Sequence, residues 1–371
     1  MYITKVSGHR QATMAIKRAI RLSDPSVEVP SINGFGYTYP RLEKIVNKTY
    51  MSIIRRTPRV WDFLYDNPKV FKQSSSLKNF LNRTSHKKLK ILFDKYQPGT
   101  VVCTQAFPCG MVADYKRTFN LPFTLIGVLT DFAPHLYWLN KGVDYYIVPS
   151  QEAKTRFMQE GIPEEAIKVY GIPIQNKFSH HPDKGSIAQK LGLDLRDPVV
   201  LIMGGGQGLG PIEETVKALA NLKRKIQIIV TTGTNKKLRE WLAEFSKTTH
   251  QKIVVYEFTR TIDELMEVAT LIVTKPGGMT TAECLAKGLP MVIVNPIPGQ
   301  EMRNTEFLTQ NGIAIHIKDV NSIATDIISL LNDPQHLKAM REAALKNGHP
   351  NAAFDIAKLI LDQPQLAALE L

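Results

Sequence analysis

The sequence predicts an α/β protein built from two doubly wound, Rossmann-like domains that face a cleft. Three observations predict this fold class. Short apolar runs alternate with amphipathic, helix-like stretches; the alternation stops near residue 176 and then restarts; and glycine-bearing turns follow several of the later apolar runs. Such alternation is typical of parallel sheets covered by helices. A length of 371 residues, 43% of them hydrophobic, fits two domains better than one.

The first half contains four apolar runs that we expect to be strands, at residues 100–103, 123–129, 145–148 and 167–170. The glycine- and proline-bearing segment 170–174 then interrupts the alternation, and a polar stretch follows it. We therefore place an N-terminal domain at residues 1–175 and a C-terminal domain at 176–350. We expect residues 351–371 to form a helix that packs back toward the N-terminal domain.

The second half contains five more apolar runs, at residues 199–203, 226–231, 253–256, 271–274 and 291–294. Helical spacing separates them, so we expect a second parallel sheet. In sheets of this kind, ligands bind where parallel strands end and the strand order reverses.

Basic residues are concentrated in the first 150 positions. These positions hold 22 Lys and Arg against 9 Asp and Glu, a net charge of +13, whereas residues 151–371 hold 25 of each. The densest stretch, residues 41–95, mixes basic and aromatic side chains, which suits an anionic bilayer surface. We expect Arg55, Arg56, Arg59 and Trp61 to dock on anionic phospholipid. No zinc-finger, RNP-like or helix-turn-helix pattern indicates nucleic acid as the partner.

The three cysteines have neither metal-ligand spacing nor an even count, so we expect small buried residues in a reducing compartment. No apolar run approaches the roughly 20 residues that a membrane span needs, and no signal-peptide core stands near the start. We therefore expect a peripheral protein on the cytoplasmic side of the cell membrane.

The first glycine turn, residues 204–211, directly follows the apolar run 199–203. Glycines allow a phosphate or a sugar to approach the backbone, and a helix start offers unpaired N–H groups. We expect ligand contacts at Gly205, Gly206 and Gly208. Such turns also serve tight strand-to-helix packing. The acidic residue expected about 20 positions later in a dinucleotide fingerprint is absent.

The second turn, residues 274–283, follows the run 271–274 and enters a helix. Thr280 and Glu283 have the spacing of a capping box, which is one interpretation. In the other, backbone N–H groups and Thr280 hold a diphosphate, and Glu283 holds a ribose diol. The candidate residues of this turn are Gly278, Met279, Thr280, Thr281 and Glu283.

The third turn, residues 295–304, contains polar side chains that suit sugar hydroxyls, namely Gln300, Glu301 and Asn304. We also expect contacts with the same ligand from the three residues after the run 253–256, which are Glu257, Phe258 and Thr259.

Segments 201–211, 274–283 and 298–304 together resemble the donor domain of glycosyltransferase family 28. Within that family, residues 8–12 near the start, with residues 129–135 and Trp138, are similar to the diacylglycerol hexosyltransferases. These comprise bacterial processive diacylglycerol glucosyltransferases and plant-type monogalactosyldiacylglycerol synthases. The resemblance covers almost the whole chain. It implies the GT-B fold, a UDP-sugar donor, a diacylglycerol acceptor and no cofactor.

The resemblance also implies an inverting transfer of glucose or galactose, in which a base removes the proton of the acceptor hydroxyl. His9 is the candidate base because its ordinary pKa lies near working pH, and Asp131 is the candidate that orients it. Gly8 belongs to the donor side, and His135 and Trp138 to the acceptor side. No D-x-D sequence occurs in the chain, so we expect helix N-termini, rather than a metal, to stabilise the leaving diphosphate.

Two other functions stay open. An enzyme of this fold could transfer N-acetylglucosamine to a polyprenyl-linked peptidoglycan precursor, although the basic-aromatic stretch and the Thr-Asp-Phe motif at residues 130–132 argue against it. The chain could also be a non-catalytic, basic nucleotide-binding module at membranes.

Overall fold

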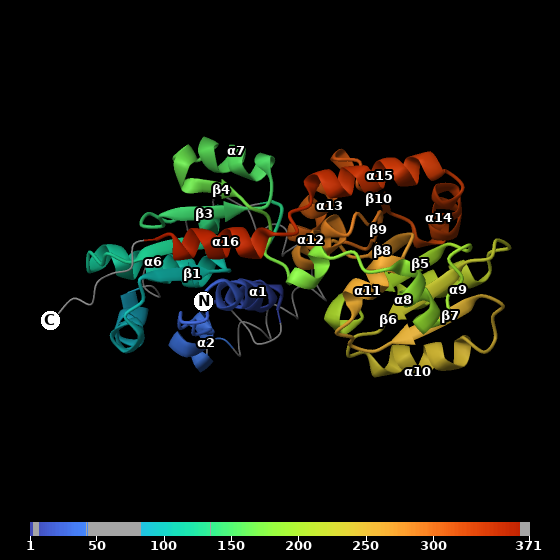
Figure 1. Cartoon of the computed structure of the whole chain (residues 1–371), viewed down its shortest axis with the longest axis horizontal. Helices are drawn as coiled ribbons and strands as arrows, with labels where there is room; N and C mark the ends of the chain where they lie inside the picture. Colours follow the sequence, from blue (N-terminus) through green and yellow to red (C-terminus); the bar gives the residue numbers. More distant parts are fainter. Residues whose placement is uncertain (3–6, 42, 44–82, 134, 364–371) are drawn as a thin grey trace. The chain divides into compact units, whose positions relative to one another are not determined.

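The computed structural model describes residues 1–2, 7–41, 43, 83–133 and 135–363. The chain forms two compact α/β units, each built on a parallel sheet, so the predicted fold class is confirmed (Figure 1). Unit 1 comprises Met1–Asn176, Ile297–Gln300 and His349–Leu371, and unit 2 comprises Lys177–Pro296 and Glu301–Gly348. We had placed the first division one residue earlier, at 175.

Unit 1 contains a four-stranded sheet in the order β1-β2-β3-β4, all parallel. The four strands fall on the four predicted apolar runs. All three cysteines are buried, as predicted, and none forms a disulfide. The elements of this unit are α1 (Gly8–Ser23), α2 (Gly34–Thr38), a helix at 83–96, β1 (Thr100–Cys103), α6 (Ala106–Thr118), β2 (Thr124–Val128), η1 (Leu136–Trp138), β3 (Tyr145–Val148), α7 (Gln151–Gln159), η2 (Glu164–Ala166), β4 (Ile167–Val169) and α16 (Ala352–Leu361).

Helices α1 and α16, from opposite ends of the chain, pack against each other on the strands β2 and β3 (Figure 1). Alanines on both helices allow this close approach, and they surround larger side chains such as Ile16 and Ile356. Burial of this apolar surface stabilises the pair. The core on the other side of the sheet is built from α6, α7 and the strands. The sheet of unit 1 is therefore covered partly by the last helix of the chain.

Unit 2 contains a six-stranded parallel sheet in the order β10-β9-β8-β5-β6-β7. Five strands were predicted; the sixth, β10, was not, because its four residues include the polar His316. The elements of this unit are η3 (Asn176–Ser179), α8 (Lys184–Leu191), β5 (Val199–Met203), η4 (Gly205–Gln207), α9 (Ile212–Ala220), β6 (Gln227–Thr231), α10 (Lys236–Phe245), β7 (Lys252–Tyr256), α11 (Ile262–Val268), β8 (Leu271–Thr274), α12 (Gly278–Ala286), β9 (Met291–Val294), α13 (Gln300–Gln310), β10 (Ala314–Ile317), η5 (Val320–Ser322), α14 (Ile323–Leu331) and α15 (Pro334–Asn347).

The strand order of unit 2 reverses at β5. The chain passes from β5 to β6 and β7 on one side, and then returns to β8 on the other side. The carboxyl ends of β5 and β8 are thus neighbours, and the Thr274 hydroxyl donates a hydrogen bond of 2.8 Å to the Met203 carbonyl there. This is the place where open α/β sheets bind ligands.

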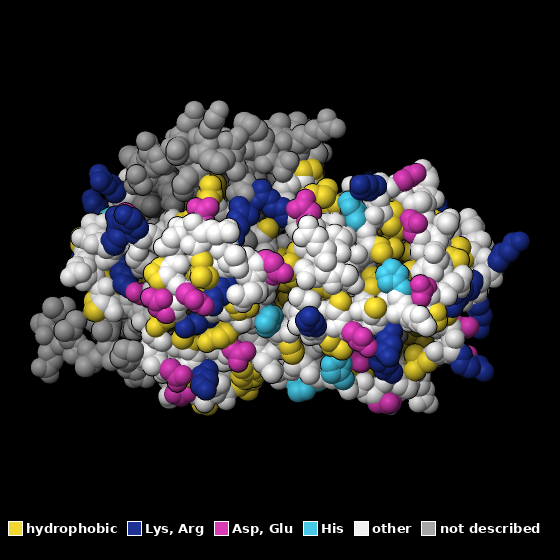
Figure 2. All heavy atoms as spheres, turned by 90° about the horizontal axis from the view of Figure 1, so that it is seen from above, with side chains coloured by type: hydrophobic (Ala, Val, Ile, Leu, Met, Phe, Trp, Pro, Cys, Tyr) yellow, Lys and Arg dark blue, Asp and Glu magenta, His cyan; other side chains and the backbone are white. Residues whose placement is uncertain are grey.

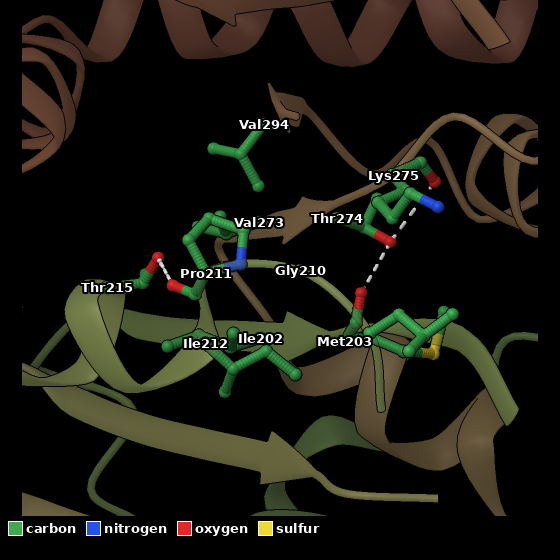
Figure 3. Close-up of a pocket in the computed structure, with 11 residues that line it drawn as sticks. Ile202, Met203, Gly210, Pro211, Ile212, Thr215, Val273, Thr274, Lys275 and Val294 are labelled. Carbon is green, nitrogen blue, oxygen red and sulfur yellow. Dashed lines mark hydrogen bonds between the residues drawn. The ribbon is translucent and has the colours of Figure 1, made fainter. Parts of the chain in front are cut away.

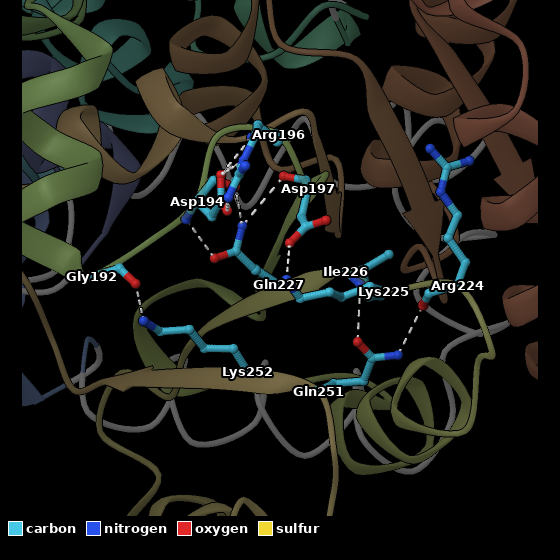
Figure 4. Close-up of polar contacts among 10 residues, drawn as sticks. All are labelled: Gly192, Asp194, Arg196, Asp197, Arg224, Lys225, Ile226, Gln227, Gln251 and Lys252. Carbon is cyan, nitrogen blue, oxygen red and sulfur yellow. Dashed lines mark hydrogen bonds and ion pairs between the residues drawn. The ribbon is translucent and has the colours of Figure 1, made fainter.

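Two buried glutamines lie at the amino-terminal ends of β6 and β7 in the same sheet, opposite the ends where β5 and β8 meet. Gln227 bonds to the backbone of Asp194 and Asp197, and Gln251 bonds to the backbone of Ile226 and Arg224 (Figure 4). Both side chains are 3% exposed or less. Because their polar atoms have backbone partners, we assign them a structural role.

A buried ion pair fixes the end of α12. Lys287, whose side chain is fully buried, lies 2.9 Å from the Glu267 carboxylate of α11 and also donates to the carbonyl of His180. The same carboxylate contacts His181 at 3.1 Å. The pair therefore connects α12 to α11 and to the chain that enters α8.

Candidate active site

The glycine loop after β5 divides into packed and open positions. A side-chain Cβ at Gly208 would lie 2.2 Å from the Thr232 carbonyl, and the N–H and C=O of Gly208 bond to Gly205 and Asn235. The prediction that Gly208 contacts the donor is therefore wrong, because its backbone groups serve the loop itself. Gly205 adopts a φ of +69°, which favours glycine. Gly206 is exposed with open space at its Cβ position, so a ligand can approach it.

Helix α12 begins the second loop. Its N-cap is Gly277, and no side chain caps it. Thr280 is therefore inside the first turn, and the capping-box interpretation is wrong. Gly278, Met279 and Thr280 lie at the helix N-terminus, where N–H groups and the helix dipole favour an anion.

Thr281, one residue further, is fully buried. The prediction that it contacts the donor is wrong, because the N-cap of α12 is Gly277, three residues before Thr280, and Thr281 lies inside the helix with its side chain buried.

Glu283 lies in the second turn of α12 and is half-buried. Burial raises the pKa of Glu283 to about 8; nearby Lys177 lowers it and nearby Asp263 raises it. Desolvation disfavours the ionised carboxylate, so this group is largely protonated at neutral pH. A ligand that donates hydrogen bonds to the carboxylate would favour ionisation.

The third loop leads into α13. Glu301 in its first turn pairs with Lys275, with 3.2 Å between Nζ and Oε1. Gln300 is half-buried at the helix start. Asn304 is fully buried, and its side-chain amide donates to the Pro276 carbonyl at 2.9 Å. The prediction that Asn304 contacts the sugar is wrong, since this residue ties α13 to the loop after β8.

The glycine loop and the loop after β8 meet at the carboxyl ends of β5 and β8, around a small pocket (Figure 3). Gly210, Pro211 and Thr215 line it from the side of the glycine loop and α9, and Thr274 and Lys275 from the end of β8. The glycine loop precedes the loop after β8 by about 70 positions, and the third loop follows it by about 20. Contacts of Lys275 with Glu301 and of Asn304 with Pro276 bring the start of α13 to the same end of the sheet.

The loop after β7 holds the remaining donor candidates. Phe258 is 65% exposed, which is unusual for a large apolar side chain. Glu257 forms an ion pair with Arg239 of α10, and Thr259 bonds to Thr261 at 3.0 Å. Of the three, Phe258 offers the most accessible surface for stacking.

In unit 1, His9 lies in the first turn of α1, next to the exposed Gly8. Its Nδ1 lies 2.9 Å from the Thr104 carbonyl and 2.8 Å from the Thr130 hydroxyl. Because a carbonyl oxygen only accepts, Nδ1 carries the proton in the neutral ring, and Nε2 keeps the lone pair. The backbone of His9 is held too, since its carbonyl accepts from Thr13 at 3.0 Å.

The surroundings of His9 favour the neutral imidazole. Burial lowers the pKa of His9 below its ordinary value, while the Asp131 charge and the hydrogen bond to Thr104 oppose this shift. A neutral imidazole with a protonated Nδ1 can accept a proton at Nε2. Asp131 is thus close enough to act on His9 by its charge, and the groups that fix the ring are Thr104 and Thr130.

Comparison with known proteins agrees with this geometry. A model of the monogalactosyldiacylglycerol (MGDG) synthase family matches residues 9–174, and a model of the glycosyltransferase family 28 C-terminal domain matches residues 199–356. Processive diacylglycerol beta-glucosyltransferase of Bacillus pumilus (strain SAFR-032) is 31% identical over 305 residues, which cover 82% of this chain and 78% of the relative. This chain belongs to the diacylglycerol glycosyltransferases of family 28. It is therefore an enzyme, and the predicted family is confirmed.

Further similarities agree with this assignment. The enzyme of the same name from Bacillus subtilis (strain 168) is 29% identical over 343 residues, covering 91% of this chain and 87% of the relative. Among solved structures, the S. aureus MnaA-UDP co-structure matches with a TM-score of 0.63 at 15% identity over 98% of each chain. MurG of Acinetobacter baumannii matches with a TM-score of 0.57 at 15% identity, over 76% of this chain and 79% of that one. These structures confirm the GT-B fold alone.

The acceptor-side candidates of the glycosyltransferase are only partly accessible. Trp138 is 4% exposed and belongs to the core of unit 1, so its prediction as an acceptor or membrane contact is wrong. His135 is half-buried and packs against Tyr137 and Trp138. The basic candidates and Trp61 lie outside the described residues; they are Arg55, Arg56 and Arg59.

Three residues of the glycosyltransferase site were not predicted: Thr104, Thr130 and Lys275. Thr130 directly precedes Asp131 in the quoted motif, so the sequence contained a signal for it. Thr104 acts through its backbone carbonyl, which no side-chain pattern reveals. In the described ranges, no group of three or more His, Cys, Asp or Glu could hold a metal ion, and no helix has the length and apolar composition to span a membrane.

Proposed function

We propose that the enzyme transfers a hexose, glucose or galactose, from a UDP-sugar to diacylglycerol, with inversion and without a metal ion. The observation that carries this proposal is the held imidazole of His9, whose Nε2 is the base. The three donor loops of unit 2 support the donor class. The names of the relatives support the acceptor, and the absence of a D-x-D sequence supports metal independence.

In the proposed step, Nε2 of His9 takes the proton of the free hydroxyl of diacylglycerol. The oxygen forms a bond to the anomeric carbon while the bond from that carbon to the UDP oxygen breaks. The leaving diphosphate gains negative charge, which the N–H groups at the start of α12 and the Thr280 hydroxyl stabilise. The proton on His9 then leaves to solvent or to the released UDP.

One assay tests the reaction. The full chain is incubated with diacylglycerol and radiolabelled UDP-glucose or UDP-galactose, in the presence and absence of a chelator. We expect a glycosylated lipid of inverted configuration at equal rates with and without the chelator. Transfer that stops with the chelator would refute metal independence. A parallel incubation contains UDP-N-acetylglucosamine and a polyprenyl-linked acceptor, and transfer in that incubation alone would refute the proposed substrates.

Glu283 makes donor affinity depend on pH. The ionised carboxylate accepts two hydrogen bonds from a ribose diol, whereas the protonated form accepts fewer. Because the pKa of Glu283 is raised to about 8, donor affinity should rise as the pH increases toward 8 and level off above it, by at most about tenfold per unit. Calorimetry with UDP-glucose from about pH 6.5 to 9.5 measures this.

The variant Glu283→Gln is the control for this pH dependence, since it keeps the shape of the side chain without the titrating group. Its donor affinity should be lower and independent of pH in this range. If the variant keeps the wild-type slope, another group titrates and Glu283 is not the ribose ligand.

We also propose that unit 1 docks on the cytoplasmic surface of an anionic membrane. Helix 83–96 supports this, because it exposes five basic side chains and the 62% exposed Ile91 beside a single acidic residue, Asp94. On the face shown in Figure 2, by contrast, acidic and basic side chains are interspersed. The exposed basic residues of the helix are Arg83, Lys87, Lys88, Lys90 and Lys95.

Vesicle sedimentation tests this docking. Each basic residue near an anionic surface contributes about 1 kcal/mol, and salt screens it. Vesicles with phosphatidylglycerol should retain the protein at low salt, and phosphatidylcholine vesicles should not. Reversing Arg55, Arg56 and Arg59 to Glu, or Lys87 and Lys88 to Glu, should reduce retention. Reversing the exposed Lys236 and Lys237 of α10 is the control, and equal loss there would refute a specific surface.

A further inference from the structure

Lys275 connects the loop after β8 to the glycine loop and to the first turn of α13, all within unit 2. It directly follows β8, in the loop that leads to α12. Its Nζ lies 3.2 Å from Oε1 of Glu301 in the first turn of α13. A Cβ at Gly210, where φ is +110°, would come within 3.9 Å of its Cδ, so its alkyl chain passes beside the glycine loop (Figure 3).

The pair of Lys275 and Glu301 differs from the surface ion pairs of the molecule. Its side chains are only 14% and 17% exposed, whereas those of Lys90 and Asp94 are 68% and 59% exposed. Exposed pairs contribute little because water screens them, but a largely buried pair has a fixed geometry and strong coupling between its partners. The Glu301 carboxylate is thus held at one position by Lys275.

The surroundings of this pair are rigid. The Asn304 side chain ties α13 to the Pro276 carbonyl at 2.9 Å, and the Thr274 hydroxyl ties the end of β8 to that of β5 at 2.8 Å. Lys275 uses one oxygen of the carboxylate, and a carboxylate has about four lone-pair sites in total. Glu301 can therefore accept hydrogen bonds from a ligand while it remains paired.

We propose that Lys275 is a positioning residue that holds the Glu301 carboxylate against the hexose of the donor, so that the pair determines affinity for the sugar part of the nucleotide. This inference rests on the proposed function and on the prediction from the sequence that Glu301 contacts the hexose hydroxyls. Glucose and galactose differ in the direction of one hydroxyl. A carboxylate at a fixed position distinguishes these directions, whereas a mobile one does so less well.

The test compares UDP with UDP-hexose. UDP lacks the sugar, so its affinity reports on the rest of the donor site. In the full chain, Lys275→Met should leave UDP affinity within about twofold and lower the affinity for UDP-glucose or UDP-galactose, whichever is the substrate, by roughly tenfold, as for loss of a charge-assisted contact. The rate ratio between the two hexoses should move toward one. Lys275→Arg should restore both properties, because it keeps the charge.

Further variants separate positioning from folding. Glu301→Gln should reproduce the effect of Lys275→Met, and the double variant should be no worse than either single one, since both changes remove the same contact. Lys236→Met on the exposed face of α10 is the control and should change nothing. If Lys275→Met does not fold, Glu301→Gln and Lys275→Arg test the inference instead, by the ratio of the affinity for UDP-hexose to the affinity for UDP.

The outcomes are distinct. Equal loss of affinity for UDP and UDP-hexose would overturn the inference, because Lys275 would then act on the diphosphate or on the loops as a whole. An unchanged hexose preference in Lys275→Met would overturn it as well. A wild-type chain that neither binds UDP nor transfers a hexose would instead refute the proposed function itself.

Discussion

Replacing His9 by alanine should lower the rate of hexose transfer by about 10²- to 10⁴-fold, which is the range for removal of a general base. The neutral ring has its proton on Nδ1, which faces the Thr104 carbonyl and the Thr130 hydroxyl at 2.9 and 2.8 Å. Alanine removes the proton acceptor but keeps helix α1. Because the diphosphate in the proposed site is held by the start of α12 in unit 2, UDP affinity should stay unchanged.

Single-turnover transfer and UDP calorimetry measure the two quantities separately. The exposed His336 of α15 provides the matched control, since His336→Ala removes an imidazole outside the site. A His9→Ala enzyme that retains more than about a tenth of the wild-type rate would show that another group takes the proton.

Replacing Lys287 by methionine should lower the free energy of unfolding by about 3–5 kcal/mol. Methionine fills similar volume, but the Glu267 carboxylate, 6% exposed, loses its fully buried partner at 2.9 Å and keeps only the more exposed His181 at 3.1 Å and Lys184 at 3.9 Å. Removing one partner of a buried ion pair is among the most costly single changes in a protein, because the remaining charge stays buried with weaker compensation. The contact from Lys287 to the carbonyl of His180 is lost as well.

Denaturant unfolding of the full chain measures this loss. Lys190→Met is the control, because Lys190 pairs with Glu264 at the surface with 64% of its side chain exposed, and should cost at most about 1 kcal/mol. The double variant Lys287→Met with Glu267→Leu should recover most of the stability, since no charge remains unpaired. A double variant as unstable as the single one would contradict a charge-based explanation.

The strands could be predicted because buried parallel strands consist of continuous apolar residues, as β5 and β8 do. The same rule missed β10, whose pattern of Ala314, Ile315, His316 and Ile317 is half-buried and therefore mixed. The sequence predicted that the last helix packs toward the N-terminal domain, but not that it packs on α1. Amphipathicity shows which face a helix buries and not against which partner.

The site was harder to predict residue by residue. Gly206 and Gly208 are the same residue type two positions apart, yet one is open and the other is packed under the Thr232 carbonyl. Only the three-dimensional path of the loop separates them. Thr281 was placed wrongly because α12 begins after Gly277, three residues before the N-cap that the capping-box pattern implied, so Thr281 is a buried residue inside the helix. The contact from Thr130 to His9 spans 121 positions, which no local pattern encodes.

The pairing of α1 with α16 has a consequence for protein synthesis. A ribosome releases Gly8–Ser23 long before Ala352–Leu361, so unit 1 lacks one covering helix until all of unit 2 has been made. Unit 2 can fold once residue 348 has emerged from the ribosome, which happens before α16 emerges. The order of folding should therefore invert the order of synthesis, and a nascent chain stalled just before α16 would expose Ala15, Ile16 and Ala19 of α1 to chaperones.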